Sequence, residues 1–209
     1  MTDHNLLIEK LSAQARPVAR PWPAGWRALA WIALALPCGA AASLLLHRSL
    51  TDWSQPGAAW AILQLALTFC AGALAIHTAF QMSIAGRRTP GWQHFAVLIA
   101  CWAASVAINL HAAVLPVTHG EGTSCYTFML VVSVPMVALV TGFLRRTRTL
   151  YPVRSLATAG AGVACMALTL LSLCHPFHLH TADLLMHIAA AVTIIAATVL
   201  CGRKWVSLP

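Results

Sequence analysis

The chain has 209 residues, of which 59% are hydrophobic and only 9% are charged. This composition excludes an ordinary water-soluble domain and is typical of a chain that lies in a lipid bilayer. The formal net charge of +8 does not indicate nucleic-acid binding, because the basic residues lie in short gaps between long apolar runs. We therefore expect a membrane protein with no direct nucleic-acid partner.

The N-terminal segment, residues 1–26, precedes the first apolar run. Leu6, Leu7, Ile8 and Leu11 recur at helical spacing. Pro17 ends this pattern, because the residue before a proline avoids the α-helical region. A helix of about 13 residues is marginal by itself in water. The segment is therefore expected to form a stable helix only when it binds either the membrane surface or a protein groove that accommodates an amphipathic helix.

Six apolar runs follow, each about 20 residues long, which is the length that an α-helix needs to cross the hydrocarbon core. The runs are 28–47, 58–82, 92–114, 125–144, 155–173 and 182–201. Because the backbone in lipid must hydrogen-bond to itself, each run is predicted to be a helix. The predicted fold is all-α and polytopic, with six transmembrane helices over residues 27–202 and a short tail over 203–209. No signal peptide is expected, since the first run is long enough to span.

The basic residues occur in alternate gaps. Twelve of the thirteen lie before the first apolar run, in the second gap, in the fourth gap or in the C-terminal tail: Lys10, Arg16, Arg20, Arg27, Arg87, Arg88, Arg145, Arg146, Arg148, Arg154, Arg203 and Lys204. The other gaps hold Arg48 and three of the five acids, Asp52, Glu121 and Asp183. The positive-inside rule therefore predicts that both termini are cytoplasmic. We expect the basic inner surface also to attract anionic lipid headgroups.

Thiol, imidazole, carboxylate and thioether side chains gather on the outward side of this topology. They are Cys125, Cys174, His119, His175, His178, His180, Asp183, His187 and Met129. Such ligands suit soft or borderline ions such as Cu(I) or Zn(II). Alternatively, Cys125 and Cys174 could form a disulfide, provided that their Cα atoms lie within about 7 Å. Metal binding, thiol redox sensing and a purely structural role stay open on the pattern alone.

Uncharged polar residues also occur within the runs. They are Gln64, His77, Gln81, Asn109 and His111. The simplest interpretation is hydrogen bonding between helices. No Asp, Glu, Lys or Arg lies deep in a run. This disfavours a metal or solute transporter, because transporters place such groups near the bilayer midplane. The absence of a C-x-x-C pair disfavours a membrane thiol oxidase, and we expect no enzyme.

Four segments carry a resemblance to a known family. They are Asn5-Leu6-Leu7-Ile8-Glu9-Lys10-Leu11 with Arg16-Pro17-Val18, Cys125 followed by Pro135, Leu173-Cys174-His175-Pro176, and Gly202-Arg203-Lys204-Trp205. Together they resemble the NrsF-type membrane anti-sigma factors, which have six transmembrane helices. The order of Cys174 and His175 departs from the family pattern, in which the histidine precedes this cysteine.

The resemblance implies a regulator of transcription in the inner membrane of a bacterium. Its N-terminal segment, including Pro17 and Val18, would hold an extracytoplasmic-function sigma factor at the membrane. Cys125 and Cys174 would sense copper, another metal or an oxidant on the outside. The main alternative from the residues is a small metal or solute transporter of the inner membrane.

Overall fold

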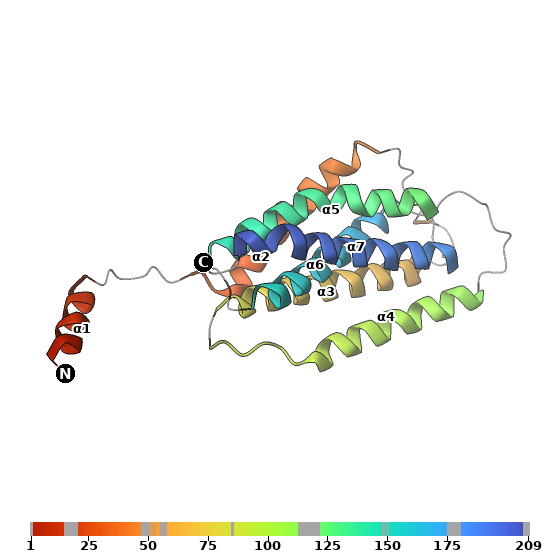
Figure 1. The fold of residues 1–209 in the computed structure, drawn as a ribbon. Helices are drawn as coiled ribbons and strands as arrows, with labels where there is room; N and C mark the ends of the chain where they lie inside the picture. Colours follow the sequence, from red (N-terminus) through yellow and green to blue (C-terminus); the bar gives the residue numbers. More distant parts are fainter. Residues whose placement is uncertain are drawn as a thin grey trace.

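The computed structural model describes residues 2–14, 21–46, 51, 53–54, 58–84, 86–112, 122–147, 149, 151–174 and 181–206. All secondary structure in these ranges is α-helical. The helices are α1 (Thr2–Gln14), α2 (Ala24–Ser43), α3 (Ala58–Met82), α4 (Trp92–Ala112), α5 (Gly122–Arg145), α6 (Pro152–Leu171) and α7 (Thr181–Val206) (Figure 1). The predicted all-α class is confirmed for this part of the chain.

Each predicted apolar run coincides with a helix. The bounds of α3 are those predicted, whereas α2 and α6 begin about a turn earlier and α7 continues about a turn further. Five helices, α2, α3, α5, α6 and α7, are long and apolar enough to cross a membrane. In α4 the described apolar part, Trp92–Ile108, is shorter than these five. The structure is therefore that of a membrane protein, and the sixth span remains a prediction.

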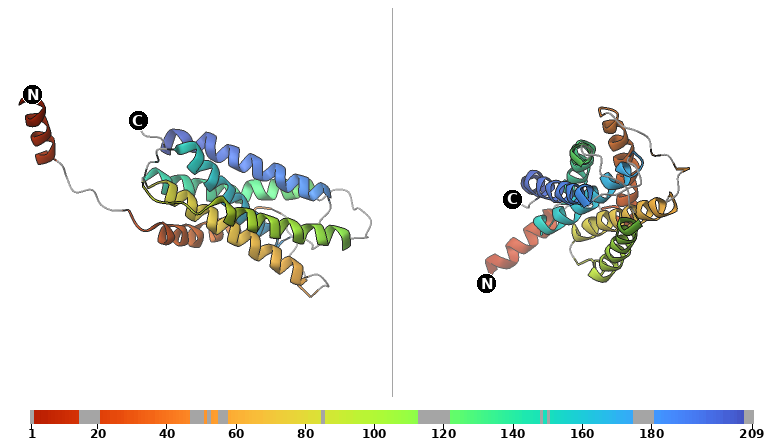
Figure 2. Two further views of the ribbon diagram at one scale, coloured as in Figure 1. Left: turned by 90° about the horizontal axis from the view of Figure 1, so that it is seen from below. Right: turned by 90° about the vertical axis from the view of Figure 1, so that its right-hand side faces the viewer.

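The long helices form a bundle around α6. Helix α6 packs against α3, α7, α5 and α2, while α4 packs on the outside of α3. The start of α2 and the end of α7 lie together, and we call this the terminal end of the bundle (Figures 1 and 2). At the opposite, distal end, α2 and α6 finish and α3, α5 and α7 begin. Successive helices therefore run in alternating directions.

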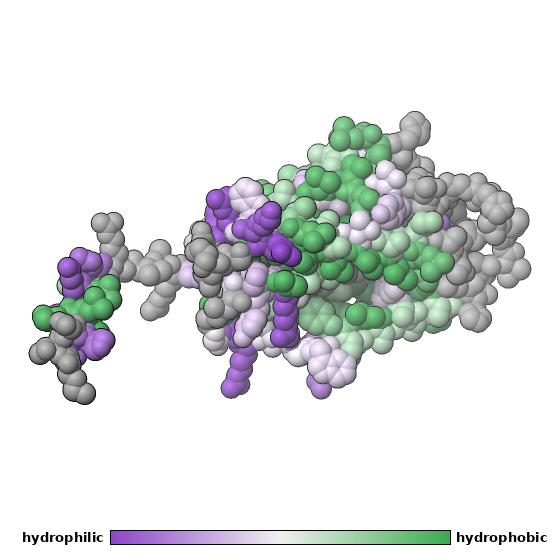
Figure 3. Space-filling view, in the orientation of Figure 1, coloured by the Kyte–Doolittle hydropathy of each residue, from purple (hydrophilic) through white to green (hydrophobic). Residues whose placement is uncertain are grey.

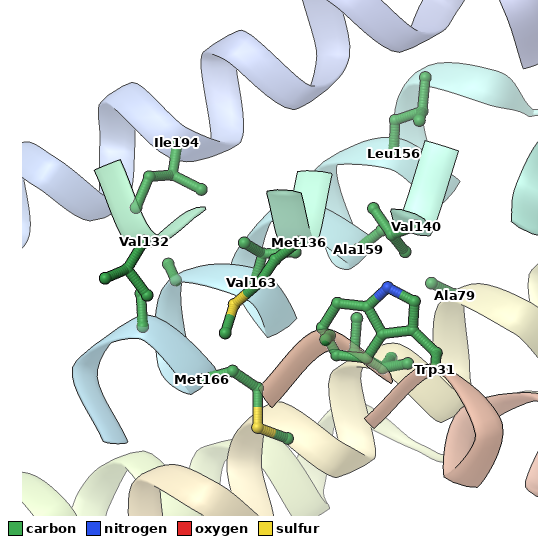
Figure 4. Packing of buried hydrophobic residues seen from close by; sticks show 14 of the residues in the cluster. Trp31, Ala79, Val132, Met136, Val140, Leu156, Ala159, Val163, Met166 and Ile194 are labelled. Atoms are coloured by element: carbon green, nitrogen blue, oxygen red, sulfur yellow. The ribbon is translucent and has the colours of Figure 1, made fainter. Parts of the chain in front are cut away.

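The bundle core consists of apolar side chains from α2, α3, α5, α6 and α7. Trp31, Met136, Val163 and Met166 are fully inaccessible, and Figure 4 shows them interleaved between the helices. Because lipid is as apolar as these side chains, helix association in a membrane depends on close van der Waals packing rather than on the hydrophobic effect. Dense interleaving is therefore what holds this bundle together.

Glycines allow α3 and α6 to approach closely. A Cβ atom added at Gly162 would lie 2.8 Å from the side chain of Ile76 and 3.1 Å from its backbone nitrogen. A Cβ atom added at Gly72 would lie 3.2 Å from the carbonyl oxygen of Gly162. Small residues at such contacts are typical of transmembrane helix pairs.

The outer surface of the bundle is largely apolar. Leu34 on α2, Val97 and Ile99 on α4, and Val192 on α7 are all at least half exposed. Figure 3 shows hydrophobic residues along the side of the bundle and hydrophilic residues gathered at the terminal end. An apolar surface of this extent would be a liability in water and is expected of a surface that faces lipid. The predicted association with a lipid bilayer is consistent with this surface.

Candidate functional site

Helix α1 stands away from the bundle (Figures 1 and 2). Every described side chain from His4 to Gln14 is exposed, and the apolar ones, Leu6, Leu7, Ile8 and Leu11, expose between 54% and 64% of their surface. The sequence predicted a helix here, and α1 ends at Gln14, before Pro17. Pro17 and Val18 lie outside the described residues. The predicted partner-binding side chains on α1 are thus present on a helix and uncovered by the bundle.

Four members of the predicted sensor cluster lie at the distal end. Cys125 and Met129 are on α5, Asp183 and His187 are on α7, and all four side chains are buried. The two helices pack against each other. His119, His175, His178 and His180 lie outside the described residues. The structure therefore brings the thiol, thioether, carboxylate and one imidazole onto two packed helices.

The contact between α5 and α7 is also polar. The hydroxyl oxygens of Tyr126 and Thr193 are 3.1 Å apart, within hydrogen-bonding distance. Asp183 lies in the first turn of α7, where the positive end of the helix dipole stabilises a carboxylate. Within the described ranges, no group of three or more His, Cys, Asp or Glu residues is arranged to hold a metal ion. Metal binding at this end stays a prediction that involves the histidines outside those ranges.

The second predicted sensor thiol, Cys174, follows the last turn of α6. Its backbone N–H donates to the Leu171 carbonyl at 2.8 Å, and its half-buried side chain packs against the same apolar core as Cys125. Thr51 stabilises this helix end, because its N–H donates to Leu173 O and its hydroxyl donates to Ser172 O, each at 3.2 Å. Although both cysteines are within the described chain, no disulfide joins them in this structure. The disulfide therefore remains a prediction.

At the terminal end, Arg27 is buried, with only 6% of its surface exposed. Its Nη1 donates to Ser83 Oγ at 3.1 Å, and its Nη2 donates to Phe143 O at 3.3 Å and to Thr147 Oγ1 at 3.1 Å. Its guanidinium carbon lies 4.6 Å from the centroid of the Phe80 ring. The sequence predicted only that Arg27 belongs to a basic gap. The structure shows that it joins α2 to the ends of α3 and α5.

Helix ends explain how this buried guanidinium is stabilised, since the partners described for it are two hydroxyls and a carbonyl rather than a carboxylate. Helix α3 ends at Met82, directly before Ser83, and α5 ends at Arg145, so that Phe143 belongs to its last turn. The last four carbonyls of a helix lack partners within the helix, and each C-terminus carries about half a negative charge. Two such ends offset about one positive charge. Arg27 is therefore a cap shared by α3 and α5.

The polar residues inside the bundle differ from expectation in their partners. His77 and Gln81 share a helix face, and their hydrogen bond, 3.0 Å between the two Nε2 atoms, runs within α3 rather than to another helix. Gln64 Nε2 has no partner among the described residues, and the side chains of Asn109 and His111 lie outside them. Hydroxyls make the connections between helices instead.

One such connection joins α6 to α3 near the distal end, where Thr169 Oγ1 donates to Thr68 Oγ1 at 3.3 Å. Another joins the same helices near the terminal end, where Ser155 Oγ donates to Ala79 O at 3.3 Å. Small hydroxyl side chains suit this position, because they let the two backbones approach. The predicted kind of interaction is present, therefore, but it is made by residues that the prediction did not name.

Comparisons of the chain with protein-family models, with curated proteins and with solved structures found no match. The functional conclusion therefore rests on the residues and contacts of this chain.

Proposed function

We propose that the chain is a membrane-embedded anti-sigma factor, in which α1 holds an extracytoplasmic-function sigma factor and the distal Cys/His cluster controls its release. The observation that carries the proposal is that two features of the chain lie at opposite ends of the bundle. An uncovered apolar helix lies beyond the terminal end, and buried soft-ligand side chains lie at the distal end. A bundle with apolar sides separates them.

Helix α1 exposes apolar side chains that binding to a partner would bury. Its exposed apolar side chains Leu6, Leu7, Ile8 and Leu11 would each contribute about 1.5–3 kcal/mol if a groove buried them fully. Amphipathic helices bind such grooves through apolar residues at spacings of three and four, as Leu7 and Leu11 are spaced. An apolar groove on a sigma factor would bury these exposed side chains of α1.

The proposed topology has six spans with both termini in the cytoplasm of a bacterial inner membrane. The distal end then faces outward, where Cys125 and Cys174 would meet a metal ion or an oxidant together with His119, His175, His178, His180, Asp183, His187 and Met129. Thiolate, thioether and imidazole ligands suit copper or another soft or borderline metal ion such as zinc. No enzymatic activity is part of the proposal.

A route for the signal runs along α5. This helix carries Cys125 at its distal start. At its terminal end Arg27 binds Phe143, in the last turn of α5, and Thr147, two residues after the helix ends. Arg27 lies on α2, directly after the segment that bears α1. A shift of α5 would therefore change the anchorage of the N-terminal segment. A coupling free energy of about 1–3 kcal/mol between the two ends would change sigma-factor affinity roughly 5- to 150-fold.

Transport is the competing function, and the position of the buried charges disfavours it. Among the described residues, the buried arginine and carboxylate are Arg27 and Asp183. Each lies at a helix end, whereas transporters place ionisable groups near the bilayer midplane. Metal flux into proteoliposomes that contain the purified protein would favour the transporter instead.

The test is affinity capture from membranes of the full chain, of a chain that lacks residues 1–26, and of the double variant Leu7→Asp/Leu11→Asp. Transcripts of the three strains are compared in parallel. We expect the full chain to capture a sigma factor, both altered chains to lose it, and both altered strains to induce the same small set of genes. The control is Gln14→Asp, which adds a negative charge to an exposed polar position of the same helix. Capture of no sigma factor by the full chain would refute the proposal.

A further inference from the structure

Five cations gather at the terminal end, where α5 and α7 finish and α6 begins. All five side chains are exposed, and an exposed tryptophan lies beside them. We call this surface the terminal basic patch, and it consists of Arg145, Arg146, Arg154, Arg203, Lys204 and Trp205. Figure 3 shows hydrophilic residues concentrated at this end of the bundle.

The backbone beneath the patch is held in place. The N–H of Thr149 donates to Val206 O at 3.3 Å, which joins the connection after α5 to the end of α7. The side chains of Leu144, Leu156 and Val206 are fully buried. A Cβ atom added at Gly202 would lie 2.7 Å from the side chain of Leu156, so α6 and α7 are in close contact here. The cations therefore project from three helix ends that are packed together.

One arginine of the patch is oriented by an aromatic ring. The guanidinium carbon of Arg145 lies 4.9 Å from the ring centroid of Trp205. Stacking on an indole covers the face of a guanidinium and leaves its edge N–H groups free to bind an anion. The planar fork of an arginine matches the oxygens of a phosphate.

Helix dipoles account for only a small part of this charge. The C-terminus of α7 offers about half a negative charge, that of α5 is shared with Arg27, and the N-terminus of α6 adds about half a positive charge. Arg154 lies in the first turn of α6, where a cation is unfavourable. The sequence from residue 122 to residue 209 contains a single acid, Asp183, and it lies at the opposite end of α7. Five cations are therefore left with a large excess of positive charge.

The surroundings of the patch favour an amphiphile over a soluble anion. Leu200 on α7 and Val153 on α6 are 65% and 57% exposed, and each lies within one helical turn of a patch cation. Tyr151, 71% exposed, adds a ring with a polar tip, a type of side chain that prefers the headgroup region of a membrane. A headgroup could bind the cations while an acyl chain lies along the neighbouring apolar side chains.

We propose that the terminal basic patch is a binding site for the phosphate of an anionic phospholipid. The site is independent of the proposed function, because it uses no residue of α1 or of the distal cluster. The lipid would hold the ends of α5, α6 and α7 together by bridging cations that otherwise repel one another.

The test uses the purified full chain in detergent, with phosphatidylglycerol and phosphatidylcholine as probes and native mass spectrometry as the measure of bound lipid. The patch variant is Arg203→Gln/Lys204→Gln. The matched control is Arg87→Gln/Arg88→Gln, which removes the same charge from another exposed basic pair outside the patch. We expect the apparent Kd for phosphatidylglycerol to rise about 30-fold in the patch variant, which corresponds to about 1 kcal/mol for each cation removed.

The control is expected to change this Kd less than about threefold, and phosphatidylcholine is expected to bind all chains weakly. Equal losses in both double variants would mean diffuse surface charge and would overturn the proposal. Competition by glycerol phosphate at lipid-like concentrations would mean a site for small anions. Unchanged lipid binding in the patch variant would leave an acidic protein surface as the better partner. If the double variant unfolds, the single variant Arg146→Gln is expected to weaken binding about fivefold.

Discussion

Replacement of Arg27 by methionine should destabilise the bundle, because it removes the cap shared by α3 and α5. Methionine fills part of the same volume but donates no hydrogen bond. Ser83 and Thr147 keep bonds to Phe80 O and Leu144 O, so the main loss is the donor to the Phe143 carbonyl. A buried acceptor that loses its donor costs about 1–3 kcal/mol, and the lost contact with the Phe80 ring adds about 1 kcal/mol or more.

Part of this cost is offset, since methionine need not be stripped of water as a guanidinium must be. We therefore expect Arg27→Met to lower the free energy of unfolding by about 2–3 kcal/mol. Arg27→Lys keeps the charge but loses the planar guanidinium with its several N–H donors, and it should lower this free energy by about half as much. Unfolding by sodium dodecyl sulfate in mixed micelles measures both. The exposed Arg88→Met is the control and should change little. A stability of Arg27→Met within about 0.5 kcal/mol of the parent would refute the shared cap.

Three further outcomes are expected. Gly162→Ala should lower the free energy of unfolding by about 1–3 kcal/mol, because its Cβ would lie 2.8 Å from the Ile76 side chain. Gly142→Ala is the control, since its Cβ would have nothing within 4 Å, and it should be neutral or stabilising in the same unfolding by sodium dodecyl sulfate. Leu7→Asp should weaken capture of the sigma factor at least tenfold without changing the unfolding curve of the bundle, and an unchanged affinity would exclude α1 as the binding element. Cys125→Ser should abolish or lock the transcriptional response to copper or oxidant, and a normal response would remove this thiol from the sensor.

The positions of the helices were predicted well from the sequence, because backbone groups in lipid must hydrogen-bond to one another. A run of about 20 apolar residues must be a helix in a bilayer, and this argument needs no knowledge of the neighbouring helices. The starts of α2 and α6 were less accurate, since Ala24 and Pro152 precede the apolar runs by about a turn. Helix starts depend on local backbone preferences, such as that of Pro152 at the first position of a helix.

The contacts between helices could not be predicted in the same way. Arg27 appears in the sequence as one of several basic residues, and its burial depends on two helix ends that are remote along the chain. The polar connections depend on which helix faces meet, so the structure uses Thr68 and Thr169 rather than Gln64 or the pair His77 and Gln81.

The distal site was predicted in part. The sequence indicated that Cys125, Met129, Asp183 and His187 lie on the same side of the membrane, and the structure buries all four on packed helices at one end of the bundle. Periodicity predicts a shared face within one helix, but it does not predict the distance between side chains on two helices. The role of this site as a sensor therefore rests on experiment.

The central claim is that α1 binds a sigma factor. Its most direct test is the affinity of a purified sigma factor, identified by capture, for the full chain in lipid nanodiscs and for the chain that lacks residues 1–26. We expect saturable binding to the full chain and an affinity at least 100-fold lower without the segment. Equal binding to both chains, or binding to neither, would contradict it.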